Sequence, residues 1–485
     1  MANYNTPGVY VEEIPTFPPS IAEVESAVPA FIGYTEKAEN LAPDDLLKVP
    51  TRISSLNEYH QFFGGAAPED PAAITINVKA YKKGAAIDKY VVKNTYLANL
   101  GKHIFYQCLK MFFANGGSSC YIVSVGKYAD NINKDKLLEG LALVALEDIP
   151  TMLVIPEAVK LAAAAEYNEV VTAIINQAKN LGDRFAILDT YTTTFPKTTA
   201  GITADVNTVK LATPSDKEIR RYGAAYYPFV ESTYTYNFDF NSLTIAAANY
   251  QLINEDGTVD GGGAPPADNF GVLENTNSIL FNALKAEFNK SHYVLPPSAA
   301  VAGIIARVDR EKGYWKAPAN VGVANVIKPF INISFLEHGN LNIDPVAGKS
   351  INVIVWQPGN GTVLMGGRTL DGNDNEWRYI NVRRFFSIVE ESVKKSTSWA
   401  VFEPNTASTW VKVQSMIESY LFMKWRDGAL AGAKPEQAYR VTVGLNKTMN
   451  AQDILEGRMI VKIEMAVSRP AEFIVLQFSH LMQQS

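Results

Sequence analysis

The sequence predicts a mixed α/β (α+β) fold: a parallel-containing sheet core with helices on both faces, and a C-terminal α+β domain. Two observations carry this prediction. Short apolar segments at residues 151–155 and 185–188 alternate with amphipathic helix-forming segments, as in parallel strands covered on both faces. Near the C-terminus, apolar and polar residues alternate one by one from Met459 to Val467, as in a half-buried strand. At roughly 150 residues per domain, the 485 residues suggest about three structural units.

The predicted elements follow one another along the chain. Residues 28–34 form a buried strand, residues 99–114 a helix ended by Asn115-Gly116-Gly117, and residues 120–125 a strand. A helix at 135–146, the strand at 151–155, a helix at 160–181 and the strand at 185–188 complete the α/β part. Further helices are expected at 299–311, 382–398 and 408–427, and a strand at 351–356. Residues 191–210 and 232–275 are rich in Thr, Asn and Gly and are expected to be insertions or exposed loops.

Both ends of the chain carry strand-like segments without an evident local partner. The N-terminal segment lies between Pro7-Gly8 and three prolines, and its strand residues are Val9, Tyr10, Val11, Glu12 and Ile14. The C-terminal segment is apolar on both faces, and its residues are Phe473, Ile474, Val475, Leu476 and Phe478. The backbone groups of such strands must pair elsewhere. The first segment is therefore either a frayed terminus or an arm. The second is either the last strand of its own sheet or a strand given to a neighbour.

Composition and charge exclude several classes of function. The net charge is −6, the isoelectric point is near 5.6, and no block of five or six basic residues occurs, so nucleic acid is not an expected partner. Two cysteines, no basic or apolar leader and no apolar run long enough to span a bilayer predict a soluble protein made in the cytoplasm, without membrane insertion. Charged residues make up only 19%, below the usual share of about 25%.

The residues that carry chemistry do not form a recognisable site. The five histidines lie far apart, and there is no His-Glu-x-x-His or Cys-x-x-Cys motif for a metal. The segment Ala347-Gly348-Lys349-Ser350 lacks the earlier glycine of a phosphate-binding loop and precedes a predicted strand rather than a helix. We therefore expect no catalytic residues, no metal and no cofactor, and a protein that is not an enzyme.

Several blocks of the sequence resemble the contractile tail sheath family, in the order in which the family has them. The blocks are Pro7-Gly8-Val9-Tyr10-Val11-Glu12-Glu13 and residues 28–35, 112–123, 295–303, 307–320, 366–370, 377–384, 390–392, 402–405 and 428–430. Met365-Gly366-Gly367-Arg368-Thr369 departs from the Trp-Gly-Ala-Arg-Thr that is common in the family. Residues 41–104 and 190–280 match poorly, which is typical of lineage-specific decoration.

The resemblance implies a structural subunit that polymerises as stacked six-fold rings around an inner tube and contracts from a metastable extended state. Its partners would be other copies of itself, the tube protein, baseplate and terminal cap proteins, and in some systems a paralogous sheath protein. The particle would assemble in a bacterial cytoplasm and be released by lysis or anchored in the cell. The implied division is a linking arm at 1–25, an α/β domain at 26–290 with insertions at 41–104 and 190–280, a tube-facing core domain at 291–470, and a second arm at 471–485.

With the resemblance, the unpaired terminal strands are predicted to link subunits by completing a sheet in a neighbour. Two weaker hypotheses concern charged side chains. Lys424, Arg426 and Lys434 either face the inner tube or lie at an ordinary solvated helix end. Arg307, Asp309, Arg310 and Arg368 form ion pairs within the subunit or across a contact that changes on contraction. The alternatives are a baseplate or capsid component and, with much less support, an α/β enzyme.

Overall fold

The computed structural model describes residues 20–96, 101–192, 195, 198–260 and 263–474. It divides into two compact units, which are described separately below. The sheet unit comprises Glu25–Ser387 and the residues from Arg469 onwards, and the C-terminal unit comprises Ile388–Ser468 and the residues up to Val24. The division lies between residues 387 and 388 rather than at the predicted position 290/291, because strands that follow residue 291 join the same sheet as the earlier ones.

A nine-stranded sheet of order β13-β16-β15-β8-β7-β6-β1-β5-β2 forms the centre of the sheet unit. Its six parallel strands are β15 (Ile351–Gln357), β8 (Gly223–Tyr227), β7 (Phe185–Asp189), β6 (Met152–Val154), β1 (Pro29–Thr35) and β5 (Cys120–Lys127). Antiparallel strands flank them: β2 (Thr51–Ile53) at one edge, and β16 (Gly361–Leu364) with β13 (Val321–Gly322) at the other. The predicted parallel-containing sheet is confirmed, since the apolar segments at 151–155 and 185–188 are its central strands.

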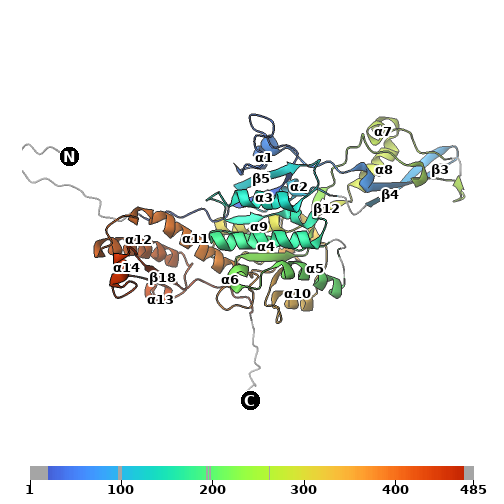
Figure 1. Ribbon diagram of the computed structural model, residues 1–485. Coiled ribbons are helices and arrows are strands. Elements are labelled where there is room, and N and C mark those ends of the chain that lie inside the picture. The colour runs from blue at the N-terminus through green and yellow to red at the C-terminus, as the bar shows by residue number, and fades with distance from the viewer. Residues whose placement is uncertain (1–19, 97–100, 193–194, 196–197, 261–262, 475–485) are drawn as a thin grey trace, which may run out of the picture. The chain divides into compact units, whose positions relative to one another are not determined.

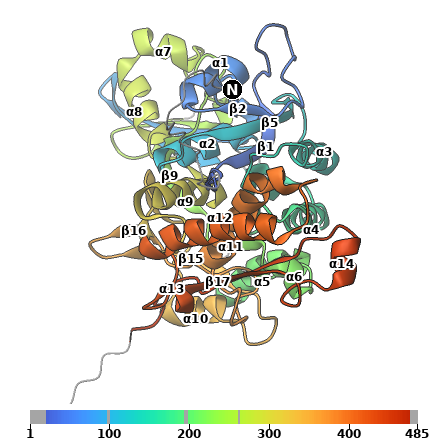
Figure 2. The ribbon, with the colours of Figure 1, turned by 90° about the vertical axis from the view of Figure 1, so that its left-hand side faces the viewer.

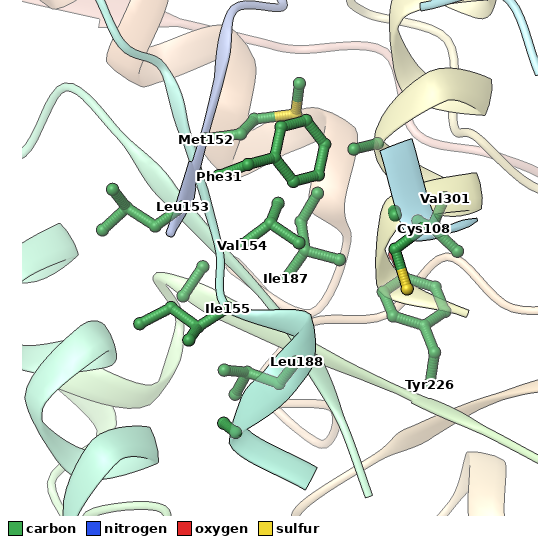
Figure 3. Packing of buried hydrophobic residues seen from close by; sticks show 14 of the residues in the cluster. Phe31, Cys108, Met152, Leu153, Val154, Ile155, Ile187, Leu188, Tyr226 and Val301 are labelled. Carbon is green, nitrogen blue, oxygen red and sulfur yellow. The ribbon is translucent and has the colours of Figure 1, made fainter. Parts of the chain in front are cut away.

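Helices cover both faces of this sheet, as predicted. One face carries α3 (Lys134–Val144) and α4 (Ala164–Leu181), and the other α2 (Phe105–Ala114) and α9 (Ser298–Lys312). On β1, Gly33 leaves room for the ring of Phe105 in α2, while Ile32 contacts Gly140 in α3 on the opposite face. Figure 3 shows Phe31, Val154 and Ile187, from three neighbouring strands, pointing toward one another within the core. Uniformly apolar strands are therefore buried on both sides, as the sequence pattern required.

One prediction for the sheet unit was wrong. Residues 191–210 were expected to be an exposed loop, but α5 (Thr199–Ala212) begins there and buries Ile202, Val206 and Val209. The composition concealed this helix because Thr, Gly and Asn are weak helix formers, although Ile202, Val206 and Val209 have the spacing of one helix face. The remaining elements around the sheet are α1 (Leu56–Phe63), α6 (Lys217–Arg220), α10 (Phe335–Asn342), the 3₁₀ helix Pro156–Lys160, and a second sheet of β12 (His292–Leu295), β9 (Val230–Thr235) and β14 (Val326–Pro329).

Parts of the two poorly matching regions fold together into a lobe with a core of its own, whereas β2 and β8 from the same regions belong to the central sheet. A four-stranded sheet of β11 (Val259–Asp260), β10 (Tyr250–Ile253), β3 (Ile74–Lys83) and β4 (Ala86–Tyr96) packs against α7 (Phe270–Thr276) and α8 (Ser278–Phe288), as Figure 1 shows. Its core contains Ile76, Val78, Phe270 and Phe288. Two stretches that are far apart in sequence thus make one folded body rather than two separate loops.

Four chain segments connect this lobe to the central sheet, and one residue, Glu69, makes hydrogen bonds that join all four. Glu69, in the first segment, accepts hydrogen bonds from the Gly101 amide (2.7 Å) and the Tyr293 hydroxyl (2.5 Å). Its own amide donates to the Asn237 carbonyl (2.8 Å), so each of the other three segments contributes one partner. Burial raises the pKa of Glu69, and the hydrogen bonds from Tyr293 and Gly101 partly offset that rise.

The C-terminal unit consists of helices packed on a small sheet. Helix α11 (Ile380–Ser396) contains the boundary between the two units and leads to the 3₁₀ helix Ser398–Ala400 and to α12 (Ala407–Arg426). Next come α13 (Pro435–Ala438), β17 (Tyr439–Val443), α14 (Ala451–Leu455) and β18 (Val461–Met465). Helix α12 packs on β17, which pairs with β18 in an antiparallel two-stranded sheet (Figure 2). The alternation from Met459 to Val467 therefore predicted β18 correctly.

Candidate assembly interface

The last residues of the N-terminal arm predicted at 1–25 are fastened to other residues of the C-terminal unit; we call Ile21–Val24 the N-arm root. The side chain of Ile21 is buried. The amides of Ala22 and Val24 donate to the hydroxyls of Ser396 and Ser392, at 3.1 Å each, on α11. Between them, the Glu23 carboxylate lies 2.8 Å from the ammonium group of Lys424 on α12. Three consecutive residues thus hold this root through separate contacts.

The start of the C-terminal arm predicted at 471–485 is fastened within the sheet unit through Glu472, which directly precedes the predicted linking strand and which we call the C-arm root. Arg368 donates to its two carboxylate oxygens from Nη2 (2.6 Å) and Nε (2.9 Å). Asn342 Nδ2 (2.6 Å) and the hydroxyl of Tyr379 (3.1 Å) also donate to this carboxylate. Burial by itself raises the pKa of Glu472, but the hydrogen bonds from Arg368 and Asn342 outweigh it and hold the pKa below its ordinary value.

Arg368 is itself fixed within the sheet unit. Its backbone amide and carbonyl both bond to the side-chain amide of Asn352 at 2.8 Å, and Nη1 donates to the Gly372 carbonyl. Only 3% of its side chain is exposed. The guanidinium is therefore shielded from solvent, and Glu472 supplies the negative charge that balances it.

The other residues of the ion-pair hypothesis take different roles. Asp309 on α9 forms a buried pair with Arg384, with oxygen–nitrogen distances of 2.5 and 2.9 Å. Arg384 also donates to the carbonyl of Ser26, just after the N-arm root. Arg307 and Arg310 donate to the backbone carbonyls of Gly322 and Gly116. These contacts lie within one subunit, and a role in contraction stays a prediction.

The residues that were predicted to face a tube differ in exposure. Lys424 is buried and pairs with Glu23 at the N-arm root, whereas Arg426 and Lys434 are exposed near the end of α12. Burial of the Lys424 ammonium group leaves it little surface to offer to another protein. Whether Arg426 and Lys434 contact a tube stays a prediction.

The predicted linking strands lie largely outside the described residues. This holds for Val9, Tyr10, Val11, Glu12 and Ile14 and for Val475, Leu476 and Phe478. Phe473 and Ile474 are described; they belong to no strand, and 67% and 81% of their surfaces are exposed. Two large apolar side chains directly after the C-arm root are thus left in contact with solvent.

The C-terminal unit offers an open place for a further strand. Within the described residues, β17 and β18 pair only with each other, so each has an outer edge without a neighbouring strand. A groove of about 760 Å³ runs alongside β18, between the end of α11 and α12. Its lining is mainly apolar and includes Val401, Phe402, Val413, Met459, Val461 and Ile463. A free strand edge beside an apolar groove is the geometry that accepts a strand from another chain.

One enzyme-like feature is a perturbed carboxyl at the end of a parallel strand. Asp189, at the carboxyl end of β7, accepts hydrogen bonds from the amide (2.8 Å) and hydroxyl (2.5 Å) of Ser298 at the start of α9. Burial raises its pKa to about 7, against the effect of these bonds. The cavity beside it measures about 20 Å³, room for roughly one water molecule and not for a substrate. Asp189 therefore caps a buried helix rather than serving a reaction.

Two further searches of the described residues bear on function. They contain no group of three or more His, Cys, Asp or Glu side chains arranged to hold a metal ion. None of their helices combines the length and the apolar character that crossing a bilayer requires.

Sequence reasoning missed the partners that matter most here. Glu472 and Arg368 are 104 positions apart, and Arg384 and Asp309 are 75 apart. No periodicity joins such distant residues. The one available signal was the presence of charged residues in strongly apolar surroundings, and that signal did select Asp309 and Arg368.

Comparison with known proteins shows what this architecture is similar to. Residues 372–479 match the model of the phage tail sheath C-terminal domain. The chain is 27% identical to a chain in the contracted sheath complex of an extracellular contractile injection system, PVC, covering 99% of both chains with a TM-score of 0.62. It is also 26% identical to a chain in the contracted helical sheath of the anti-feeding prophage, covering 98% of this chain and 99% of that one with a TM-score of 0.63.

The chain is similar to contractile tail sheath proteins over almost its whole length, and residues 372–479 match the C-terminal domain of the phage tail sheath. Curated relatives agree: it is 26% identical over 218 residues to the tail sheath protein of Enterobacteria phage T4, which is 44% of this chain and 31% of that protein. A putative prophage major tail sheath protein of Pseudomonas aeruginosa (strain UCBPP-PA14) is 27% identical over 117 residues, 24% of this chain and 30% of that protein. The chain thus spans about a third of the curated relatives that it matches. Family and fold together point to a structural sheath protein.

Proposed function

We propose that this chain is the repeating subunit of a contractile sheath, stacked as six-fold rings around an inner tube and contracting to drive that tube through a target envelope. The match of almost the whole chain to sheath chains of contractile injection systems is the observation that carries the proposal. Those two chains come from a sheath complex and a helical sheath, and a third similar chain comes from a baseplate structure with six-fold symmetry. The corresponding partners here are other copies of the chain, a tube protein and a baseplate, in a phage-tail-like particle.

The two arms supply the links between copies in this proposal. The N-arm root is fastened within the C-terminal unit and the C-arm root within the sheet unit. Each unit of a subunit therefore carries the root of one linking strand, Val9–Ile14 or residues 473–478. The outer edges of β17 and β18 and the groove beside β18 receive such a strand from a neighbour. Strand addition gives backbone hydrogen bonds for affinity and side-chain pockets for specificity. It also completes a two-stranded sheet that is marginal by itself.

Deletion of residues 1–14 tests this proposal while keeping the N-arm root intact. The chain is expressed with its tube and baseplate partners, and particles are counted by negative-stain electron microscopy. We expect the truncated chain to remain monomeric, because its linking strand is absent while the buried contacts of the root remain. Deletion of residues 1–4, which spares Val9–Ile14, serves as the matched control and should still assemble. Full-length sheaths from the longer deletion would refute the role of the arm.

The tube-facing surface is the less strongly supported part of the proposal. Arg426 and Lys434 are the exposed cations of the predicted set, so the double substitution Arg426→Glu with Lys434→Glu should weaken capture of the inner tube in a pull-down. The exposed Lys412 on α12 provides a control charge reversal in the same unit. Equal tube capture by both variants would place the tube contact elsewhere.

A baseplate component is the second candidate, because one of the similar chains belongs to the baseplate of the anti-feeding prophage. The two candidates differ in copy number. A sheath subunit labelled with antibody decorates the whole shaft of a particle, whereas a baseplate component is found at one end only.

A further inference from the structure

Helix α10 and the loop after it present a surface without exposed charge. The exposed residues of this stretch, which we call the α10 surface, are Ser334, Phe335, Leu336, Gly339, Asn340, Ile343, Pro345, Val346 and Ala347. Phe335 and Val346 are 95% and 94% exposed, and Leu336 is 74% exposed. Large apolar side chains on so open a surface, with no charged residue among the exposed ones, are typical of the centre of a protein–protein contact.

The charged residues of the same stretch, half-buried Glu337 and buried Asp344, are engaged in contacts that fix its shape. Glu337 forms a capping box with Ser334 and accepts a hydrogen bond from Thr199 on α5 (2.7 Å). Asp344 pairs with Lys210 at 2.7 Å and accepts from the amides of Val346 and Ala347. The apolar side chains are therefore held on a defined support, and their exposure is not that of a frayed loop.

The C-arm root lies at this surface and indicates what covers it. Asn342, the last residue of α10, donates to Glu472, and the exposed Phe473 and Ile474 follow directly. The chain continues from there through residues 475–485, which even fully extended span no more than roughly 40 Å. Any copy that holds this arm is therefore tethered close to the α10 surface, at a high effective concentration.

We propose that the α10 surface packs against a second copy of this chain in the assembled sheath. The proposal rests on the proposed sheath function and adds to the arm a second contact, made by a preformed apolar face. Contacts of this kind in an open helical polymer join different patches of the two copies, so the α10 surface meets a surface other than itself.

A photo-crosslinking amino acid at position 335 or 346 identifies what lies against this surface. In assembled particles, we expect a covalent dimer of the chain, recognised by mass spectrometry. The variant that lacks residues 1–14 should give no dimer, because it does not assemble. Crosslinking to the tube protein, or no adduct in assembled sheaths, would overturn the proposal. A wild-type chain that forms no sheath would instead contradict the proposed function itself, and this contact with it.

A substitution gives an independent test. Leu336→Asp should lower the yield of sheaths at least about tenfold, while the melting temperature of the free subunit stays within about 2 °C of wild type, because the side chain is exposed. Leu146→Asp, at a residue that is 82% exposed after α3, is the matched control and should assemble normally. Wild-type sheath yield from Leu336→Asp would count against the α10 surface, whatever the crosslinking shows at its rim.

Discussion

The two arm roots are both fastened to the folded chain, but through different arrangements of contacts. The N-arm root distributes its contacts over Ala22, Glu23 and Val24, two of which bond through the backbone. The C-arm root concentrates them on the single carboxylate of Glu472. A distributed root tolerates the loss of any one side chain, whereas a concentrated root depends on one. The comparison therefore predicts unequal effects of single substitutions at the two ends of the chain.

The largest effect is expected at the buried pair that supports the chain just after the N-arm root. Asp309→Ala leaves Arg384 buried without a counter-charge, which should lower the free energy of unfolding by about 3–5 kcal/mol. Urea unfolding of the free subunit, followed by tryptophan fluorescence, measures this. The double variant Asp309→Leu with Arg384→Met removes both charges and should recover most of the loss. A small effect of the single variant would mean that water reaches this pair.

The next effect tests the concentrated root directly. Glu472→Ala removes every hydrogen bond at the C-arm root and leaves Arg368 buried, so we expect a loss of about 2–3 kcal/mol in unfolding free energy. Phe473→Ala, at the exposed neighbouring position, should change the stability by less than about 0.5 kcal/mol. Similar values for the two variants would remove the distinction between the roots.

The C-arm root should also loosen in acid. Because the pKa of Glu472 is lowered in the folded state, its contribution is present above its unfolded value of about 4.3 and is lost as the pH falls through the folded value. The stability difference between wild type and Glu472→Gln should therefore shrink below about pH 4. Unfolding curves of both chains over a pH series measure it. A constant difference would show that Glu472 does not titrate in this range.

The smallest effect belongs to the distributed root. Glu23 is about a third exposed, so Glu23→Gln should cost no more than about 1 kcal/mol even though its partner Lys424 is buried. Hydrogen exchange of the Ala22 and Val24 amides is the sensitive measurement. We expect both amides to stay protected in this variant, because they still donate to the serine hydroxyls. Loss of protection at both amides would show that this root, too, depends on one carboxylate.

What could be predicted from the sequence was set by local patterning. Uniformly apolar strands such as β6 and β7, and the alternation in β18, are read within a few residues, and the long blocks around α9 carried the resemblance to contractile tail sheath proteins. Two things were not local. Helix α5 is amphipathic but poor in strong helix formers, so it resembled a loop. The partners of Asp309 and Arg368 lie far away along the chain, and only tertiary structure brings them together.

The tie at Glu69 has a consequence for engineering. Gly101, Asn237 and Tyr293 all bond to this one residue. The segments that connect the lobe of β3, β4, α7 and α8 are therefore held together at one point. The lobe could be exchanged for that of a related sheath if both of its parts were replaced together and these four positions were kept. The new lobe would then retain the hydrogen bonds at Glu69. Exchanging only one of the two insertions would split the lobe's own core and leave half of the graft without a fold to join.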